Sequence, residues 1–143
     1  MGLWNKCIYL EIPMEINVEN QVKYWINGAT EDLDVASILI EKSRHLHGLF
    51  FCHLVIEKAL KAHVVKITRR LAPKSHNLIY LSEKSELTLN DQTLEFFGVL
   101  MKYQLEGRYP GYQPYIPEER IVKGYLKETK NQLSWLKEKL SNY

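Results

Sequence analysis

Hydrophobic residues recur at steps of three and four along the first third of the chain. The series runs through Val22, Trp25, Ile26, Ala29, Leu33, Ala36, Leu39 and Ile40, with acidic residues between its members. This period predicts an amphipathic helix over about residues 19–43. After a break around Gly48, residues 49–67 are apolar on most of the helical circumference. Such a pattern is typical of a central helix that neighbours cover on all sides.

Three further helices follow from the same reading. Ser75 is the expected N-cap of a short helix that closes near Ser85. Asn90 or Asp91 begins the next helix, which Gly107 ends, and the last helix begins near residue 118 or 119. The chain shows no sustained two-residue alternation of the kind that predicts strands. We therefore predict an all-α fold, an antiparallel up-and-down bundle of four long helices plus one short helix.

Composition and charge are consistent with one small domain. The chain has 143 residues, of which 45% are hydrophobic, enough for one core. Residues 15–143 are predicted to form the bundle and residues 1–14 an N-terminal extension, because Met14 stands just before the helical pattern. The net charge of +2 is too small to indicate a nucleic-acid or membrane partner. Six acids in residues 11–34 and six bases in residues 44–70 favour antiparallel pairing of the first two helices.

Cysteine and histidine usage indicates neither a metal site nor a disulfide framework. Cys7 and Cys52 match no metal-ligand spacing, and His53, His63 and His76 are widely separated. The most apolar stretch is far shorter than a membrane span. We expect a cytoplasmic protein without cofactor, metal or membrane association.

Three sequence stretches carry a resemblance to a known family. They are residues 53–63 (HLVIEKALKAH), 72–81 (APKSHNLIYL) and 103–110 (YQLEGRYP). In this order they resemble the HEPN family of small helical domains, and the resemblance covers roughly residues 15–143. It implies a homodimer and, often, a minimal nucleotidyltransferase as the gene partner in a toxin–antitoxin pair. It also implies nucleotide binding or, in a large subset, metal-independent RNA cleavage by the Arg and His of an Arg-x(4–6)-His motif.

The chain departs from the pattern of the ribonuclease members. Their motif lies at the start of the last long helix, and residues 108–120 contain no histidine. Arg70 and His76 have the required spacing but lie between two helices. We therefore predict a non-catalytic homodimeric module that binds a nucleotide or a nucleotidyltransferase-type antitoxin. The alternative is a metal-independent RNA endonuclease that uses Arg70 and His76, or Arg108 with a histidine supplied from elsewhere.

Candidate ligand-binding residues occur in two places. His76 and Asn77 would lie at the first turn of the short helix, where they could bind a phosphate or merely cap the turn. Arg108, Tyr109 and Tyr112 place a cation among aromatic rings, which suits a nucleotide, although tyrosines also pack loops onto a bundle.

A polar stripe crosses the otherwise apolar central helix. His53, Glu57 and Lys61 are spaced four residues apart and so share one face. They could form an internal or dimer-interface hydrogen-bond network, or a catalytic acid/base pair. The apolar circumference of this helix also predicts the homodimer, because three companion helices should leave part of it uncovered.

Overall fold

The computed structural model describes residues 15–105, 110–111 and 114–142, and within these residues the secondary structure is entirely helical. Its helices are α2 (Val18–Glu41), α3 (His45–Thr68), α4 (Leu78–Lys84), α5 (Asp91–Met101) and α6 (Glu119–Leu140). The predicted all-α fold is confirmed. The prediction for residues 1–14 lies outside the described residues.

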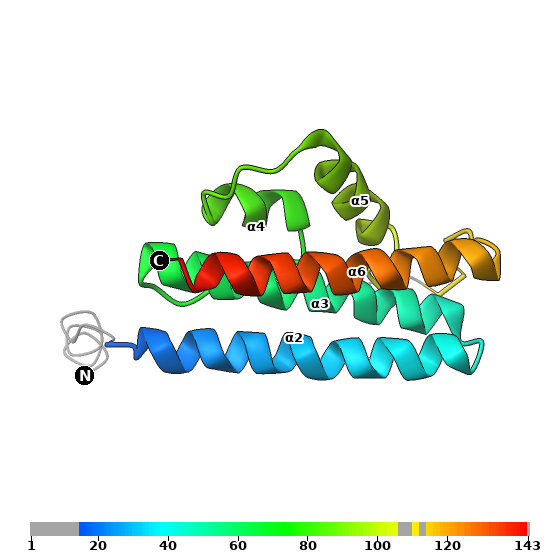
Figure 1. Cartoon of the computed structure of the whole chain (residues 1–143), viewed down its shortest axis with the longest axis horizontal. Helices are drawn as coiled ribbons and strands as arrows, with labels where there is room; N and C mark the ends of the chain where they lie inside the picture. Colours follow the sequence, from blue (N-terminus) through cyan, green and yellow to red (C-terminus); the bar gives the residue numbers. More distant parts are fainter. Residues whose placement is uncertain (1–14, 106–109, 112–113, 143) are drawn as a thin grey trace, which may run out of the picture.

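The four longer helices, α2, α3, α5 and α6, alternate in direction along the chain (Figure 1). The long helices α2, α3 and α6 run lengthwise, with α2 antiparallel to α3 and α6, while α4 and the inclined α5 cover one side. Helix α3 packs against each of the other four helices. Most of its residues are buried, including Leu49, Val55, Ile56 and Leu60. The central position predicted for this helix is confirmed.

The break between α2 and α3 lies earlier than expected. Helix α2 ends at Glu41, Ser43 adopts a left-handed conformation with φ 61°, and α3 already begins at His45. Gly48 is therefore inside α3, and the prediction that it marks the break was wrong. A Cβ atom at this position would collide with the side chain of Ile40. The glycine allows α2 and α3 to approach closely.

The short helices are capped by asparagines. The Oδ1 atom of Asn77 accepts hydrogen bonds from the N–H groups of Ile79 and Tyr80, both at 3.0 Å. The expected cap, Ser75, instead accepts a bond from the Asn77 N–H group at 3.1 Å, so that prediction was wrong. Asn90 caps α5 as predicted. Helix α5 ends at Met101, before Gly107, which lies outside the described residues.

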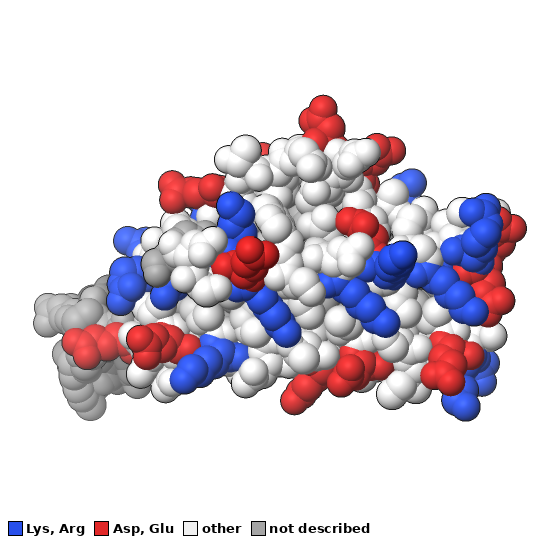
Figure 2. Space-filling view, viewed as in Figure 1, with Lys and Arg blue, Asp and Glu red and all other residues white. Residues whose placement is uncertain are grey.

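Charge pairing links α2 to α3 as the sequence predicted. Asp32 and Lys58 form an ion pair at 2.7 Å between the two helices. On the face shown in Figure 2, acidic side chains prevail along the α2 edge and basic ones over the middle, without a continuous surface of either sign. None of the described helices has both the length and the apolar character needed to cross a bilayer.

Candidate functional site

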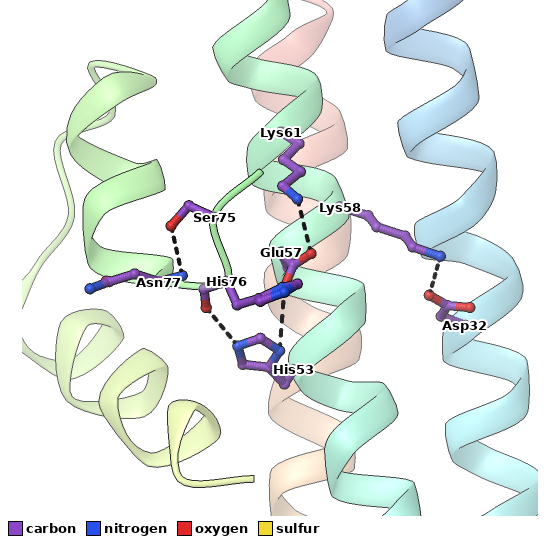
Figure 3. Close-up of polar contacts among 8 residues, drawn as sticks. All are labelled: Asp32, His53, Glu57, Lys58, Lys61, Ser75, His76 and Asn77. Carbon is purple, nitrogen blue, oxygen red and sulfur yellow. Dashed lines mark hydrogen bonds and ion pairs between the residues drawn. The ribbon is translucent and has the colours of Figure 1, made fainter. Parts of the chain in front are cut away.

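The polar stripe of α3 meets a segment that returns alongside the helix. His53, Glu57 and Lys61 lie one turn apart on the face of α3 that is turned away from α6 (Figure 3). Residues 69–77, which we call the connector, join α3 to α4 and bring His76 over this stripe. Side chains from two segments therefore converge on Glu57.

Each oxygen of the Glu57 carboxylate has a hydrogen-bond partner. His76 donates from Nδ1 to Oε1 at 2.9 Å, and Lys61 donates from Nζ to Oε2 at 3.1 Å. The Nε2 atom of His53 donates to the main-chain oxygen of His76 at 3.0 Å, while its Nδ1 atom lies 3.8 Å from Oε1. Because a carbonyl oxygen only accepts, the first of these contacts places a proton on His53 Nε2. Both the ring and the main chain of His76 are thus attached to α3.

Burial divides this cluster into a hidden part and a surface part. His53 is completely buried, and the side chains of Glu57 and Lys61 are only 5% and 7% exposed. The imidazole of His76, by contrast, is 43% exposed. A buried carboxylate is tolerated only when it is paired and hydrogen-bonded. Lys61, whose Nζ atom also lies 5.2 Å from the ring centroid of Trp25, supplies part of that pairing.

The structure does not bring together the side chains of Arg70 and His76, the pair that the ribonuclease alternative requires. The side chain of Arg70 makes no hydrogen bond or ion pair within the described part of the chain, and its main-chain N–H group bonds to Thr68. Glu57, which holds His76, is separated from Thr68 at the end of α3 by about 16 Å along the helix axis. Arg70 lies beyond that end. The structure therefore does not bring Arg70 to the imidazole.

The structure differs in two ways from the phosphate site that we predicted at the start of the short helix. His76 precedes the N-cap and is not in the first turn of α4, so that part of the prediction was wrong. The N–H groups of Ile79 and Tyr80 are already bonded to Asn77. Asn77 therefore acts as a helix cap, and two of the first-turn donors that could have received an anion from solvent are occupied.

The second predicted ligand site is only partly described. Arg108, Tyr109 and Tyr112 lie outside the described residues. Of the neighbouring tyrosines, Tyr103 is buried and its hydroxyl donates to the main-chain oxygen of Tyr115 at 3.2 Å. Burial raises the pKa of Tyr103. Tyr103 thus packs the chain against the bundle, whereas the Tyr115 side chain is 83% exposed.

Comparison with known proteins identifies the family. The family model described as the HEPN domain matches residues 22–140, which is most of the chain. The chain belongs to the HEPN family. A search of curated proteins finds no match. The crystal structure of TT1696 from Thermus thermophilus has a similar fold, with a TM-score of 0.69 and 21% sequence identity. The similarity covers 84% of this HEPN chain and 98% of that chain.

Another buried histidine of the HEPN bundle lies apart from this cluster. His63 donates from Nε2 to the main-chain oxygen of Leu136 on α6 at 2.8 Å. Burial lowers its pKa, and the nearby Lys139 acts in the same direction. Through its bond to Leu136, His63 fixes α6 to α3.

Among the residues that the structure describes, no group of three His, Cys, Asp or Glu side chains could hold a metal ion.

The pairing of Glu57 with His76 was missed from the sequence. The spacing of the stripe indicated that its polar groups need partners, but it did not say which residues supply them. The partner lies 19 residues away and is brought there by the path of the connector. The only available signal was the histidine next to Asn77, at the start of a capped helix.

Proposed function

We propose that this HEPN domain is a homodimeric binding module without catalytic activity, and that it binds a nucleotide or a nucleotidyltransferase-type antitoxin through the connector. The main support is the charge that the connector exposes. Arg69, Arg70 and Lys74 are exposed, and none of them has an ion-pair partner among the described residues. His76 anchors the segment that carries them.

The surroundings of the connector favour an anionic partner. Residues 58–82 contain no aspartate or glutamate, and the nearby Glu57 is buried and paired. A group of unpaired cations attracts phosphates or acidic protein surfaces. Anchoring limits the conformational freedom that the segment loses on binding, which favours affinity. A nucleotide and the acidic surface of an antitoxin both satisfy this chemistry.

The absence of catalysis is inferred from what RNA cleavage requires. One group must remove the 2′-hydroxyl proton, and another must protonate the leaving oxygen or stabilise charge at the same phosphate. His76 could serve as one group. Lys61 is almost fully buried against Glu57, and Arg70 follows the far end of α3. A second accessible group close to His76 is thus not supplied by these residues.

A second copy is expected to cover the remaining apolar surface of α2 and α3. The other four helices cover α3 more completely than we expected, but Phe50 and Leu54 remain partly exposed. Helix α2 exposes Val35 and Ile38. Sedimentation equilibrium at micromolar concentration tests the homodimer, and a monomer there would contradict it.

Binding can be tested by calorimetric titration. ATP, AMP and a purified minimal nucleotidyltransferase of the antitoxin type are the titrants. We expect the substitutions Arg70→Glu and Lys74→Glu to weaken binding at least tenfold, whereas Lys127→Glu, which reverses an exposed charge on α6, should not. Absence of heat with every titrant, or equal effects of the three variants, would contradict the proposal.

The endonuclease remains the second candidate because of one observation. Glu57 orients the half-exposed imidazole of His76, as carboxylates do for histidines that act as general bases. The test is incubation of the purified protein with structured and single-stranded RNA in the presence of a chelator. Cleavage that is lost in His76→Ala or in Arg108→Ala would overturn the non-catalytic proposal.

A further inference from the structure

Helix α6 carries most of its basic side chains on one exposed face. These residues lie three, four or seven positions apart and therefore share that face: Arg120, Lys123, Lys127, Lys130 and Lys137. We call them the basic ridge, which extends for about 26 Å along the helix axis. Figure 2 shows basic side chains along α6, bordered by the acidic side chains of the α2 edge.

Most of the basic ridge has no partner within the fold. Lys127, Lys130 and Lys137 form no ion pair with any residue that the structure describes. The other two members pair with exposed glutamates that precede them in the chain, in Arg120–Glu118 at 2.9 Å and Lys123–Glu119 at 3.5 Å. Like charges three or four residues apart on a helix repel each other and lower its stability. The basic ridge is therefore an unfavourable feature of the isolated fold, and a negatively charged partner would relieve it.

The acidic residues nearby do not neutralise the basic ridge. Helix α2 packs against α6 and exposes Glu19, Asp34 and Glu41. None of these three carboxylates forms an ion pair within the described part of the chain. Glu138, which is also exposed, borders the C-terminal end of the ridge. This face of the bundle thus presents a strip of positive charge that is one helix wide and has a negative border.

We propose that the basic ridge binds a protein partner through an acidic helix that lies along α6. Carboxylates that recur on such a helix at steps of three and four residues meet Lys127, Lys130 and Lys137 over a length of about 15 Å. Charged side chains select partner and orientation in this way between the helices of coiled coils. Basic residues on the flank of the partner helix face the acids of α2, which sets the direction of docking.

The surroundings of the basic ridge favour a protein helix over a nucleic acid. The ridge contains no aromatic ring on which a base could stack, and four of its five members are lysines, which lack the bidentate phosphate contacts of arginine. The acids of α2 repel a second row of phosphates beside the first. The polar stripe and the connector lie on the face of α3 that is turned away from α6. The inference is therefore independent of the proposed function of the connector.

NMR titration of the isotope-labelled full chain with a synthetic peptide tests the surface directly. The probe is an amphipathic peptide of about 21 residues with glutamates at helical spacing on one face, and the control peptide has the same composition with the glutamates scattered around the helix. We expect the probe to shift the main-chain signals of Lys127, Lys130 and Ser134 and to leave that of His76 in place. It should bind at least tenfold more tightly than the control peptide.

Variants at exposed positions leave the core intact and separate the ridge from other charges. The double variant Lys127→Glu with Lys130→Glu should weaken binding of the probe at least tenfold, and a probe with lysines in place of the facing glutamates should restore it. Lys139→Glu reverses an exposed charge on α6 outside the ridge and should have little effect. Arg70→Glu in the connector should also leave probe binding unchanged, so failure of the proposed function does not affect this test.

Four results would overturn the inference. The first is no shift of the ridge signals with the probe. The second is equal affinity for the probe and the control peptide, which indicates only general attraction between opposite charges. The third is tighter binding of an RNA duplex of about 20 base pairs that is lost in the same double variant, which makes the ridge a nucleic-acid surface. The fourth is a shift of the ridge signals with protein concentration alone, which assigns the ridge to a second copy of the chain.

Discussion

The buried carboxylate of Glu57 should contribute strongly to the stability of the fold. The substitution Glu57→Gln keeps the size of the side chain but removes its charge and places an amide where the carboxylate accepted two bonds. Lys61, only 7% exposed, would then be left as a buried ammonium without its counter-ion. Removing one partner of a buried ion pair typically costs about 3–5 kcal/mol. This is a large part of the roughly 5–15 kcal/mol that stabilises an ordinary domain.

Urea denaturation followed by circular dichroism at one fixed protein concentration measures this loss. The matched control is Glu118→Gln, which breaks an ion pair with Arg120 of similar length, 2.9 Å, between side chains that are 65% and 79% exposed. An exposed pair is worth at most about 1 kcal/mol. We therefore expect a large difference between two Glu→Gln substitutions, one in a buried and one in an exposed ion pair.

A second variant tests whether Lys61 causes the loss. In the double variant Glu57→Gln with Lys61→Met, the stranded charge is gone, so the free energy of unfolding should recover by about 1 kcal/mol or more relative to Glu57→Gln alone. A loss below about 0.5 kcal/mol for Glu57→Gln, within the ordinary range of surface substitutions, would refute the reasoning. So would a double variant that is less stable than the single one.

The remaining predictions concern other parts of the bundle. Gly48→Ala should lower the free energy of unfolding by about 1–3 kcal/mol, because the added methyl group meets α2. Gly124→Ala has open space around the added methyl group and should raise the free energy of unfolding by about 0.5–1 kcal/mol. Equal effects of the two substitutions in urea denaturation would contradict this prediction. The pKa of His63 is lowered by burial, so below about pH 6.5 the unfolded chain binds the proton and stability should fall, and His63→Gln should flatten this dependence between pH 7.5 and 5. Burial raises the pKa of Cys52 to about 11, so in a Cys7→Ser background a thiol reagent should modify the native protein far more slowly than the denatured one.

Periodicity alone was enough to predict the helices and the central position of α3. It placed the break after the first helix at Gly48 because glycine often ends helices. The structure shows that this glycine serves the close approach to Ile40, a tertiary contact that spacing within one segment does not contain. The choice of Asn77 over Ser75 as the cap depends in the same way on the path of the connector.

Only the part of the candidate site that lies on a single helix, α3, could be predicted from the sequence. His53, Glu57 and Lys61 share a face because of the helical repeat, and this could be derived from their numbers. The attachment of His76 could not, because it depends on how the connector folds back after α3. Arg70 illustrates the reverse case, since a spacing that matches a motif in letters does not bring two side chains together when a helix end lies between them.

The hydrogen bond between His63 and the Leu136 carbonyl joins residues 73 positions apart, and it has a consequence for the newly made chain. At roughly 5–20 residues per second, a ribosome needs about 4–15 s to synthesise the intervening segment. Helices α2 and α3 can pair early, because they are adjacent in sequence and joined by a short turn. Until α6 emerges, the side of α3 that α6 covers stays open to solvent. During each round of translation this nascent hairpin exposes apolar surface of the kind that chaperones bind, and the C-terminal helix ends that exposure.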